Sequence, residues 1–443
     1  MLRALHVFPT FGADLVYGAE RHEYLLSKKL VELGVAVDVL TTLTASYRQT
    51  SALSNAWPRD YRQAAEVTDG MRIERFASFS LPPRIGHALS RLMLKRWRRE
   101  ELRYGLMAAG SLNLVDYYYR RARERPWYYD SMMLLARGPY APGLVRRLLR
   151  IGRDYDVLLV GFIPFALNWQ VICAARVLRK PVALLALFHP EDLYHHFRAI
   201  YWCLNSAGAI LAQTPFSESL FRRMFPKSRP VSAGVGVDPG EFDRSARCGA
   251  RFRQRYGIRA GKIVLFVGRK EYFKRYDLAI DALNLLADER VGLVMIGRDV
   301  DGIAVDSPYA TFLGELPRQD LLDAYDACDL LIVPSQSESF GWVVLEAWAC
   351  RKPVIGNRLC APVRSVIDDG VNGFVCSGAA EMACRIAQLT ADPELTRRLG
   401  QAGFEKVAHR YTWDIIGRNV RDLYAQLANF QAERGPHPGA FPF

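Results

Sequence analysis

The sequence predicts an α/β protein built from two doubly wound parallel sheets, each covered by helices on both faces. The chain has 443 residues, which is too long for one hydrophobic core and suits two domains. Half of the residues are hydrophobic, so the chain can fill two cores. Short apolar segments alternate with amphipathic helical segments, and the alternation restarts in the second half of the chain. Such an alternation is typical of parallel sheets.

The first half opens with a strand, a glycine-containing loop, a helix and a second strand. The helix is expected over residues 19–34, with Gly34 as its stop signal. The strands expected in this sheet are short apolar runs, at residues 3–8, 35–42, 156–160, 181–188 and 208–213. Residues 46–154 differ, because they are basic, rich in Tyr and Trp, and lack this rhythm. We therefore expect an insertion there.

The strand and helix pattern restarts after VSAGVGVDPGEF, residues 231–242. KIVLFVG, VGLVMIG, ATFLGEL and DLLIVP are the expected strands, and YDLAIDALNLLA and RQDLLDAYDAC are expected helices between them. We divide the chain into a first domain at 1–245 and a second at 246–410. A helix at 411–430 is expected to cross back to the first domain, and 431–443 to form a flexible tail.

The net charge of +13 predicts an acidic partner. Residues 84–150 contain fifteen Lys and Arg but five Asp and Glu, so they carry most of this charge. The segment RLMLKRWRREELRYGLM, residues 91–107, places Leu and Trp among its cations, as an interfacial helix does. We therefore expect contact with an anionic membrane surface, with a solvated charged face as the alternative. No nucleic-acid partner is expected, because no motif that reads nucleic acid accompanies the charge.

Several sequence features favour a cytoplasmic protein. The eight cysteines are scattered without a CxxC pair, which favours reduced thiols over disulfides or a zinc site. Pro9, Gly12 and Asp14 interrupt the N-terminus before an apolar stretch could form, so no signal peptide is expected. Residues 156–175 come nearest to a membrane span, but a glycine and a proline interrupt them. We expect a strand, a loop and a helix there.

The segment SQSESFGWVVLEAW, residues 335–348, places two glutamates around a strand-to-helix junction. The preceding DLLIVP predicts a buried parallel strand, and doubly wound sheets bind ligands at the carboxyl ends of their strands. Free backbone N–H groups at the start of the next helix form an anion site. These groups belong to Ser339, Phe340, Gly341 and Trp342. The arrangement suits a diphosphate, with one of Glu338 and Glu346 on the ribose and the other on the group beyond the phosphates.

The segment FVGRKEYFKR supplies two cations at the end of another strand. Arg269 follows the strand directly, and Lys274 comes five residues later, across a loop. Two fixed cations that face a helix N-terminus would neutralise a diphosphate that leaves as a glycosidic or ester bond breaks.

Taken together, these segments resemble the retaining nucleotide-sugar glycosyltransferases of family 4. ESFGWVVLEA is similar to that family's double-glutamate motif, FVGRKEYFK to its diphosphate-binding Arg/Lys pair, and VYGAERHEYLLSKKLVELGVAVDVLTT to its N-terminal loop and helix. AGAILAQTPFSESLF, AGVGVDPGEF and FLGELPRQDLLDAYDACDLLIVPS also match in order and spacing. The resemblance covers most of the chain outside 46–154. It implies the GT-B fold, in which an acceptor-binding and a nucleotide-sugar-binding Rossmann-like domain face a central cleft.

The resemblance implies roles for the residues of the second domain. Glu338 would contact the donor sugar, and Glu346 would hold the ribose hydroxyls. The backbone amides from Phe340 through Val343 would bind the sugar and the phosphates. The cations Arg269 and Lys274 would stabilise the departing diphosphate.

The resemblance also implies roles outside these two motifs. Gly18 would present a backbone N–H to phosphate, and His189 would touch the sugar near its reacting carbon. The turn at Glu315 and Leu316 would meet the base. The chain departs from the family pattern at Tyr17 and Arg275, where the family usually has glycine.

Two residue clusters raise a metal hypothesis that we do not favour. The first consists of His189, Glu191, Asp192, His195 and His196, and it lacks HExxH spacing. The second is Asp299 and Asp301, a DxD that binds metal in a differently folded class of transferases. It follows a strand, so we interpret it as a polar loop. We expect no metal and no cofactor, and a nucleoside diphosphate sugar as substrate.

The sequence thus predicts a retaining glycosyltransferase that moves a hexose from a nucleoside diphosphate sugar to a lipid-linked or cell-surface glycan. Its expected place is the inner face of the membrane, in the assembly of a cell-envelope polysaccharide or lipopolysaccharide. The leaving diphosphate is expected to assist proton removal from the acceptor. The alternatives are a nucleotide-sugar epimerase on the same fold and a non-catalytic protein that binds membrane surfaces.

Overall fold

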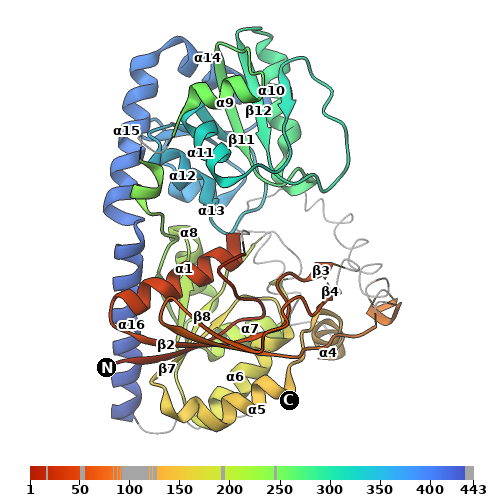
Figure 1. Cartoon of the computed structure of the whole chain (residues 1–443), viewed down its shortest axis with the longest axis vertical. Coiled ribbons are helices and arrows are strands. Elements are labelled where there is room, and N and C mark those ends of the chain that lie inside the picture. The colour runs from red at the N-terminus through yellow and green to blue at the C-terminus, as the bar shows by residue number, and fades with distance from the viewer. Residues whose placement is uncertain are drawn as a thin grey trace. The chain divides into compact units, whose positions relative to one another are not determined.

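The computed structural model describes residues 1–15, 18–49, 55–82, 84–86, 88–89, 91, 119, 122, 127–190, 195–243 and 247–434. The described chain forms two compact units, coloured by residue number in Figure 1. Unit 1 contains the described residues before Val235 and those from Trp413 onward, and unit 2 contains the described residues of 235–412. Most of the basic stretch 84–125 and the tail from residue 435 lie outside the described residues.

The sheet of unit 1 has eight strands among the described residues, in the order β10-β9-β8-β7-β1-β2-β6-β5. These strands are β1 (Arg3–Val7), β2 (Ala36–Thr42), β5 (Ala65–Thr68), β6 (Met71–Phe76), β7 (Val157–Gly161), β8 (Val182–Leu185), β9 (Ala209–Ala212) and β10 (Arg229–Ser232). Every neighbouring pair is parallel except β5 and β6. The five apolar runs predicted as strands all form strands of this sheet.

The strands β5 and β6 differ from the sequence-based expectation. The sequence indicates a basic insertion at 46–154 without the strand and helix rhythm, yet β6 pairs in parallel with β2 and extends the sheet. The sequence of β6, MRIERF, alternates between apolar and charged side chains, and its burial alternates in the same way. A strand with one buried face lacks the continuous apolar signal of a central parallel strand. A short antiparallel pair, β3 (Arg48–Gln49) with β4 (Asn55–Ala56), also falls in this segment.

Helices cover both faces of the unit 1 sheet (Figure 1). The helices and helical turns are α1 (Gly18–Glu32), α4 (Trp127–Arg137), α5 (Pro142–Ile151), η1 (Gly152–Asp154), α6 (Ala166–Leu178), α7 (Arg198–Ser206), α8 (Pro215–Met224) and α16 (Trp413–Arg434). On one face α1 packs against α16, and on the other α5, α6 and α7 enclose the main core. The buried His6 of β1 joins both helices of the first face, through Ser27 Oγ at 2.8 Å and Tyr424 Oη at 3.1 Å.

The sheet of unit 2 has six parallel strands in the order β13-β12-β11-β14-β15-β16. These strands are β11 (Lys262–Val267), β12 (Val291–Ile296), β13 (Ala310–Phe312), β14 (Leu330–Val333), β15 (Val354–Asn357) and β16 (Gly373–Cys376). The chain builds outward from β11 in one direction and then crosses back to build from β14 in the other. The sheet order therefore reverses between β11 and β14, where doubly wound sheets bind ligands.

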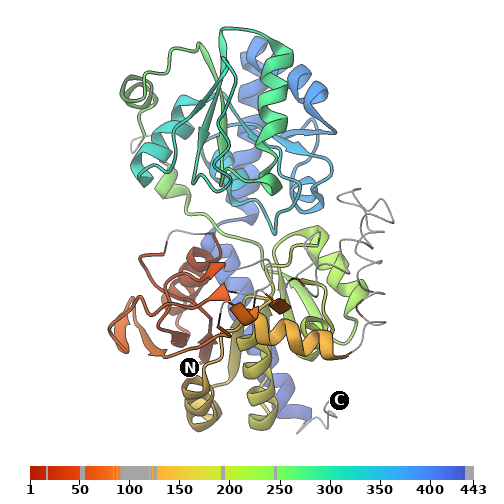
Figure 2. The same cartoon turned by 90° about the vertical axis from the view of Figure 1, so that its right-hand side faces the viewer.

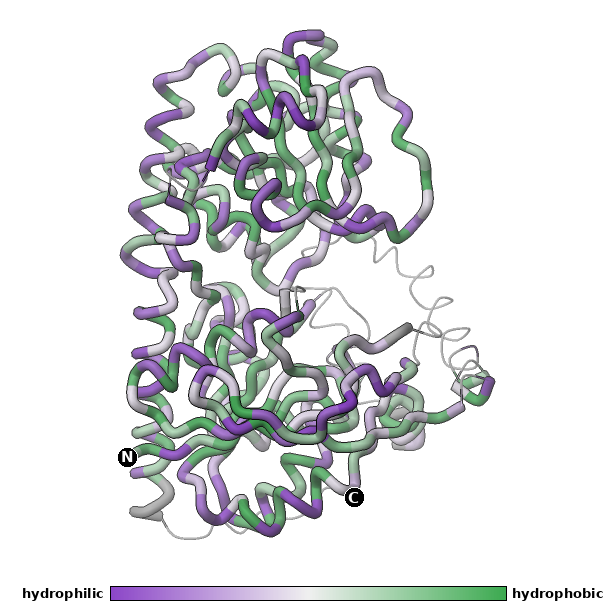
Figure 3. Tube along the Cα trace, in the orientation of Figure 1, coloured by the Kyte–Doolittle hydropathy of each residue, from purple (hydrophilic) through white to green (hydrophobic). Residues whose placement is uncertain are grey.

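Helices cover both faces of the unit 2 sheet as well (Figure 2). They are η3 (Pro239–Phe242), α9 (Gly249–Arg255), η5 (Tyr272–Lys274), α10 (Tyr276–Leu286), α11 (Arg318–Ala327), α12 (Trp342–Ala349), α13 (Ala361–Val366), α14 (Ala379–Ala391) and α15 (Pro393–Arg410). One face packs α10 and α14, and the other packs α9, α11 and α12. The strands between them are among the most hydrophobic parts of the trace in Figure 3.

The short helix α12 is anchored by one large aromatic side chain. Trp348 is fully buried, and its indole N–H donates to the carbonyl of Asn372 at 2.9 Å. Gly403 of α15 leaves room for the ring, because a Cβ there would lie 2.1 Å from Trp348 Cδ1. This packing fixes the end of α12 and therefore the position of its N-terminus.

In the part of the chain that the structure describes, no helix is both long enough and apolar enough to cross a membrane. The apolar run 156–175 divides into β7, a loop and α6. All eight cysteines lie among the described residues, and none of them forms a disulfide bond.

Candidate active site

The loops after β11 and β14 carry the two motifs singled out in the sequence. Because β11 and β14 are neighbours in the sheet, their carboxyl ends place the two loops side by side. Gln336 donates its backbone N–H to the carbonyl of Phe273 at 2.9 Å, which joins one loop to the other. The candidate site of unit 2 is thus a single constellation at the point where the sheet order reverses.

Lys274 and Glu338 form an ion pair at the centre of this constellation. Lys274 Nζ lies 2.6 Å from Glu338 Oε1, and the hydroxyl of Ser335 donates to the same oxygen at 2.8 Å. Glu338 is 8% exposed, so burial strengthens its attraction to the ammonium group. The pair fixes the position of the Lys274 ammonium group at the carboxyl edge of the sheet.

The residues of the predicted anion site lie at the start of α12. Gly341 caps the helix in the left-handed region at φ +89°, and a Cβ there would lie 3.2 Å from Val363 Cγ2. Glycine is therefore the residue that fits. Ser339 and Phe340 precede Gly341, and the first helical N–H groups have no partner within the helix. Trp342 and Val343 form that first turn, and both side chains are half-buried.

Glu346 lies one turn further along α12 and is held by two residues of α11. Arg318 Nη1 donates to Glu346 Oε1 at 2.9 Å, and the hydroxyl of Tyr325 donates to Oε2 at 2.8 Å. Burial alone would lower the pKa of Arg318, but the carboxylates of Glu346 and Glu241 raise it above its usual value. Burial, reinforced by Glu346, raises the pKa of Tyr325 well above its usual value. Arg318 therefore stays charged and Tyr325 stays a hydroxyl donor.

The turn predicted to meet the base lies directly before α11. Glu315 is exposed and Leu316 is half-buried, and Arg318 begins α11 two residues later. Arg269 also lies at the carboxyl edge of the sheet. Its side chain is 56% exposed, and its guanidinium lies 2.8 Å from the carboxylate of Glu271.

The polar loop at Asp299 and Asp301 encloses a buried lysine. Lys270 is 1% exposed, and its ammonium pairs with Asp299 at 2.8 Å, with Asp301 and with the carbonyl of Ile303 at 2.7 Å. Burial by itself lowers the pKa of Lys270, but hydrogen bonds to the two aspartates raise it overall. The DxD thus holds the loop that carries Arg269.

Gly18 and His189 both lie in unit 1. Gly18 begins α1, after the loop that follows β1. His189 follows β8, and its backbone N–H donates to His195 Nδ1 at 3.3 Å. His196 is buried, with ring nitrogens 2.6 Å from Tyr201 Oη and 2.8 Å from the carbonyl of Pro190. These contacts give His195 and His196 a packing role, while Glu191 and Asp192 lie outside the described residues.

Sequence reasoning missed Ser335, Arg318, Tyr325 and Lys270. The contacts of Arg318, Tyr325 and Lys270 join segments distant in sequence. Only the SxxE spacing from Ser335 to Glu338 could have signalled one of the four residues. The amphipathic pattern of α11 marks its buried face, but it does not reveal that Arg318 and Tyr325 reach the same carboxylate.

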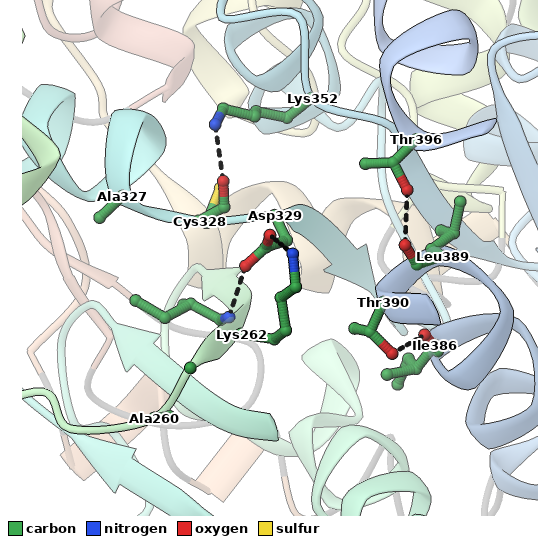
Figure 4. Close-up of polar contacts among 12 residues, drawn as sticks. Ala260, Lys262, Ala327, Cys328, Asp329, Lys352, Ile386, Leu389, Thr390 and Thr396 are labelled. Carbon is green, nitrogen blue, oxygen red and sulfur yellow. Dashed lines mark hydrogen bonds and ion pairs between the residues drawn. The ribbon is translucent and has the colours of Figure 1, made fainter. Parts of the chain in front are cut away.

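A pocket of about 240 Å³ lies at the opposite, amino edge of the unit 2 sheet (Figure 4). It is lined by Lys262, Cys328, Asp329, Arg351, Lys352, Leu389, Pro393, Thr396 and Arg397. Lys262 pairs with Asp329 at 3.0 Å, and Lys352 donates to the carbonyls of Asp326 at 3.0 Å and Cys328 at 2.6 Å. These cations tie β11, β14 and the end of α11 together, so we assign the pocket a structural role.

Two Rossmann-like parallel-sheet units are characteristic of the GT-B class of folds. Residues 250–406 match the family model described as Glycosyl transferases group 1. This segment of the chain carries the pattern of that family, and the predicted fold class and the predicted resemblance are both confirmed.

Curated relatives carry the name D-inositol 3-phosphate glycosyltransferase. The protein from Xylanimonas cellulosilytica is 33% identical over 223 residues, which are 46% of this chain and 52% of that protein. The protein from Kribbella flavida is 26% identical over 428 residues, which are 90% of this chain and 88% of that protein. The chain spans about half the length of the first of these relatives.

Solved structures with the same fold include HepE of Anabaena in complex with UDP and glucose. It is 17% identical, with a TM-score of 0.63, and the match covers 96% of this chain and 100% of HepE. Sucrose-phosphate synthase of Thermosynechococcus elongatus is 18% identical, with a TM-score of 0.65 and coverage of 97% and 100%. At these identities the likeness establishes the fold.

Proposed function

We propose that the chain transfers a hexose from a nucleoside diphosphate sugar to a glycan or lipid-linked acceptor, with retention of configuration. The observation that carries the proposal is the Lys274–Glu338 ion pair beside the start of α12, where the sheet order reverses. HepE was crystallised with UDP and with UDP-glucose, so a UDP sugar is the first donor to test. The names of the curated relatives support a hydroxyl group as acceptor.

In the proposed reaction the nucleoside diphosphate leaves as the bond between its terminal phosphate oxygen and the sugar breaks. The first N–H groups of α12 and the ammonium of Lys274 stabilise the charge that develops on that oxygen. The acceptor hydroxyl bonds to the sugar carbon, and its proton passes to the departing diphosphate. Glu338 binds the donor sugar and Glu346 the ribose hydroxyls.

The remaining roles follow from the position of each residue on its own unit. Arg269 adds positive charge beside the diphosphate, and the turn of Glu315 and Leu316 meets the base. On unit 1, Gly18 offers a backbone N–H to phosphate and His189 contacts the transferred sugar.

We expect release of nucleoside diphosphate from a UDP, GDP or ADP sugar to persist in excess EDTA. The physical reason is that Lys274 and the α12 N-terminus already supply positive potential at the leaving group. A coupled assay of diphosphate release measures turnover, and NMR of the product gives its anomeric configuration. Turnover abolished by EDTA and restored by Mn²⁺ would contradict the metal-free mechanism and return Asp299 and Asp301 as candidate ligands.

The same assay separates the two other candidate functions. An epimerase leaves the bond between the sugar and the diphosphate intact in its product, so new sugar nucleotide would form without net release of diphosphate. A non-catalytic binding protein would release none and form no new sugar nucleotide.

We further propose that the chain works at the cytoplasmic face of a membrane, on a precursor of a cell-envelope polysaccharide or lipopolysaccharide. Residues 84–125 contain eleven Lys and Arg and four Asp and Glu. Each cation near an anionic leaflet contributes about 1 kcal/mol before screening.

We therefore expect co-sedimentation with anionic liposomes that weakens at high salt. Reversal to glutamate at Lys95, Arg96, Arg98 and Arg99 is expected to reduce the bound fraction several-fold. The matched control reverses the exposed cations Arg222, Arg290 and Arg397, and it should leave binding unchanged. Equal binding to neutral and anionic liposomes would overturn the proposal for this stretch.

A further inference from the structure

The carboxylate of Glu346 is oriented by two donors from a single neighbouring helix. Arg318 Nη1 donates a hydrogen bond to Glu346 Oε1 at 2.9 Å, and the hydroxyl of Tyr325 donates one to Oε2 at 2.8 Å. A carboxylate has about four lone-pair positions, so one position per oxygen remains for other donors. Two adjacent hydroxyl groups, such as those of a ribose, match that remaining pair. The side chain of Glu346 is 13% exposed, so little motion is left to it.

The guanidinium of Arg318 is itself held in place. Its Nε lies 2.9 Å from Glu241 Oε1, and its carbon lies 5.0 Å from the centre of the Phe242 ring. Both contacts come from η3. The Nη2 atom of Arg318 is buried and makes no hydrogen bond among the described residues. A buried donor without a hydrogen bond lowers the stability of the fold, so this geometry favours precise placement of the guanidinium over maximal stability.

The charge of Arg318 also suits a site for a diphosphate. An uncompensated carboxylate at Glu346 would repel an anion bound at the start of the same helix. Arg318 offsets that charge while the two outward lone pairs of Glu346 remain usable. Arg318 also pairs with Glu241, so its single positive charge is shared between two carboxylates and reduces the repulsion without cancelling it.

The helix that carries both donors is anchored independently of Glu346. Asp323 of α11 accepts from Arg251 Nε at 2.5 Å, from Arg251 Nη2 at 2.7 Å and from the backbone N–H of Cys248 at 2.8 Å. These contacts join α11 to α9. Arg251 of α9 therefore forms an ion pair with α11 without touching Glu346, and it provides a matched control.

From this geometry we propose that Arg318 is a positioning residue that orients Glu346 and so sets a preference for ribonucleotides over 2′-deoxyribonucleotides. Tyr325 completes the orientation. The inference rests on the proposed function, because it assigns Glu346 to the ribose of a bound nucleoside diphosphate. It adds residues of α11 that touch neither the sugar nor the phosphates.

The test measures dissociation constants by calorimetry on the full chain. UDP, GDP, ADP and CDP are titrated first, and the tightest binder is then compared with its 2′-deoxy analogue. Arg318→Met is expected to weaken the ribonucleotide about tenfold and the deoxy analogue less than threefold. Arg318→Lys should recover part of the loss, since it restores charge without the forked geometry. Arg251→Met should leave the ratio of the two constants unchanged.

Two further variants keep the outcome decisive. Tyr325→Phe removes one hydroxyl donor and should also weaken the ribonucleotide more than its 2′-deoxy analogue. This variant tests the proposal if Arg318→Met does not fold. Adding Arg318→Met to Glu346→Gln should cause little further loss, because both act on one contact. Equal weakening of the two nucleotides, or additive losses, would overturn the positioning role alone. A native chain that binds none of the four nucleotides would overturn the proposed function itself.

Discussion

Replacing Lys274 with methionine is expected to lower kcat for donor turnover by about two to three orders of magnitude. The ammonium lies 2.6 Å from Glu338 and is the fixed positive charge at the proposed leaving group. Removing one preorganised group that stabilises developing charge typically has an effect of about this size. The substitution also leaves Glu338 buried without its cation. Steady-state assays with the best donor measure the loss.

The control for this variant is Lys262→Met. Lys262 forms an equivalent ion pair with Asp329 at 3.0 Å, but at the amino edge of the same sheet (Figure 4). It should lower stability slightly and leave kcat within about twofold. Similar losses of kcat in both variants would show that Lys274 acts through the stability of unit 2 and would contradict its assigned role.

Gly297→Ala is expected to destabilise unit 2 by about 3 kcal/mol or more and to abolish most donor turnover. Gly297 follows β12 with φ +145°, and a Cβ there would lie 2.0 Å from the carbonyl oxygen of Gly268. The added methyl group must push aside the backbone that leads into Arg269. Denaturant unfolding measures the first effect and the donor assay the second.

Gly302→Ala separates steric displacement from backbone strain. Gly302 has φ +67°, in the left-handed region, but no atom lies within 4 Å of the position of its Cβ. Its replacement by alanine should lower the free energy of unfolding by only about 1 kcal/mol and leave donor turnover unchanged. If both variants lost the same unfolding free energy, backbone strain alone would explain the effect of Gly297→Ala. The close approach of its Cβ to Gly268 would then be unimportant.

The strands and the glutamate-bearing helix could be predicted because their signals are local. Central parallel strands are continuous apolar runs, and the segment around Gly341 combines such a run with a glycine and a helix start. The strand β6 could not be predicted in the same way, because charged residues alternate along MRIERF where one face of the strand packs on the core.

The contacts that orient the site depend on the tertiary fold. Arg318 and Tyr325 meet Glu346 only because α11 and α12 pack on the same face of the sheet. Lys270 meets Asp301 because β11 and β12 are parallel neighbours whose following loops run together. The spacing of these residues in the sequence predicts neither set of contacts. A site derived from motifs alone therefore includes the groups expected to bind the ligand but lacks the groups that orient them.

Unit 1 is complete only after the helix α16 has been synthesised, because α16 follows unit 2 in the chain but packs in unit 1. Its buried face includes Ile416, Val420, Leu423, Tyr424 and Leu427. The bond from Tyr424 to His6 spans 418 positions of the chain. A nascent chain on the ribosome can therefore assemble all of unit 2 while the apolar surface beside α1 still lacks its covering helix. That surface stays exposed to solvent until residues 413–434 emerge.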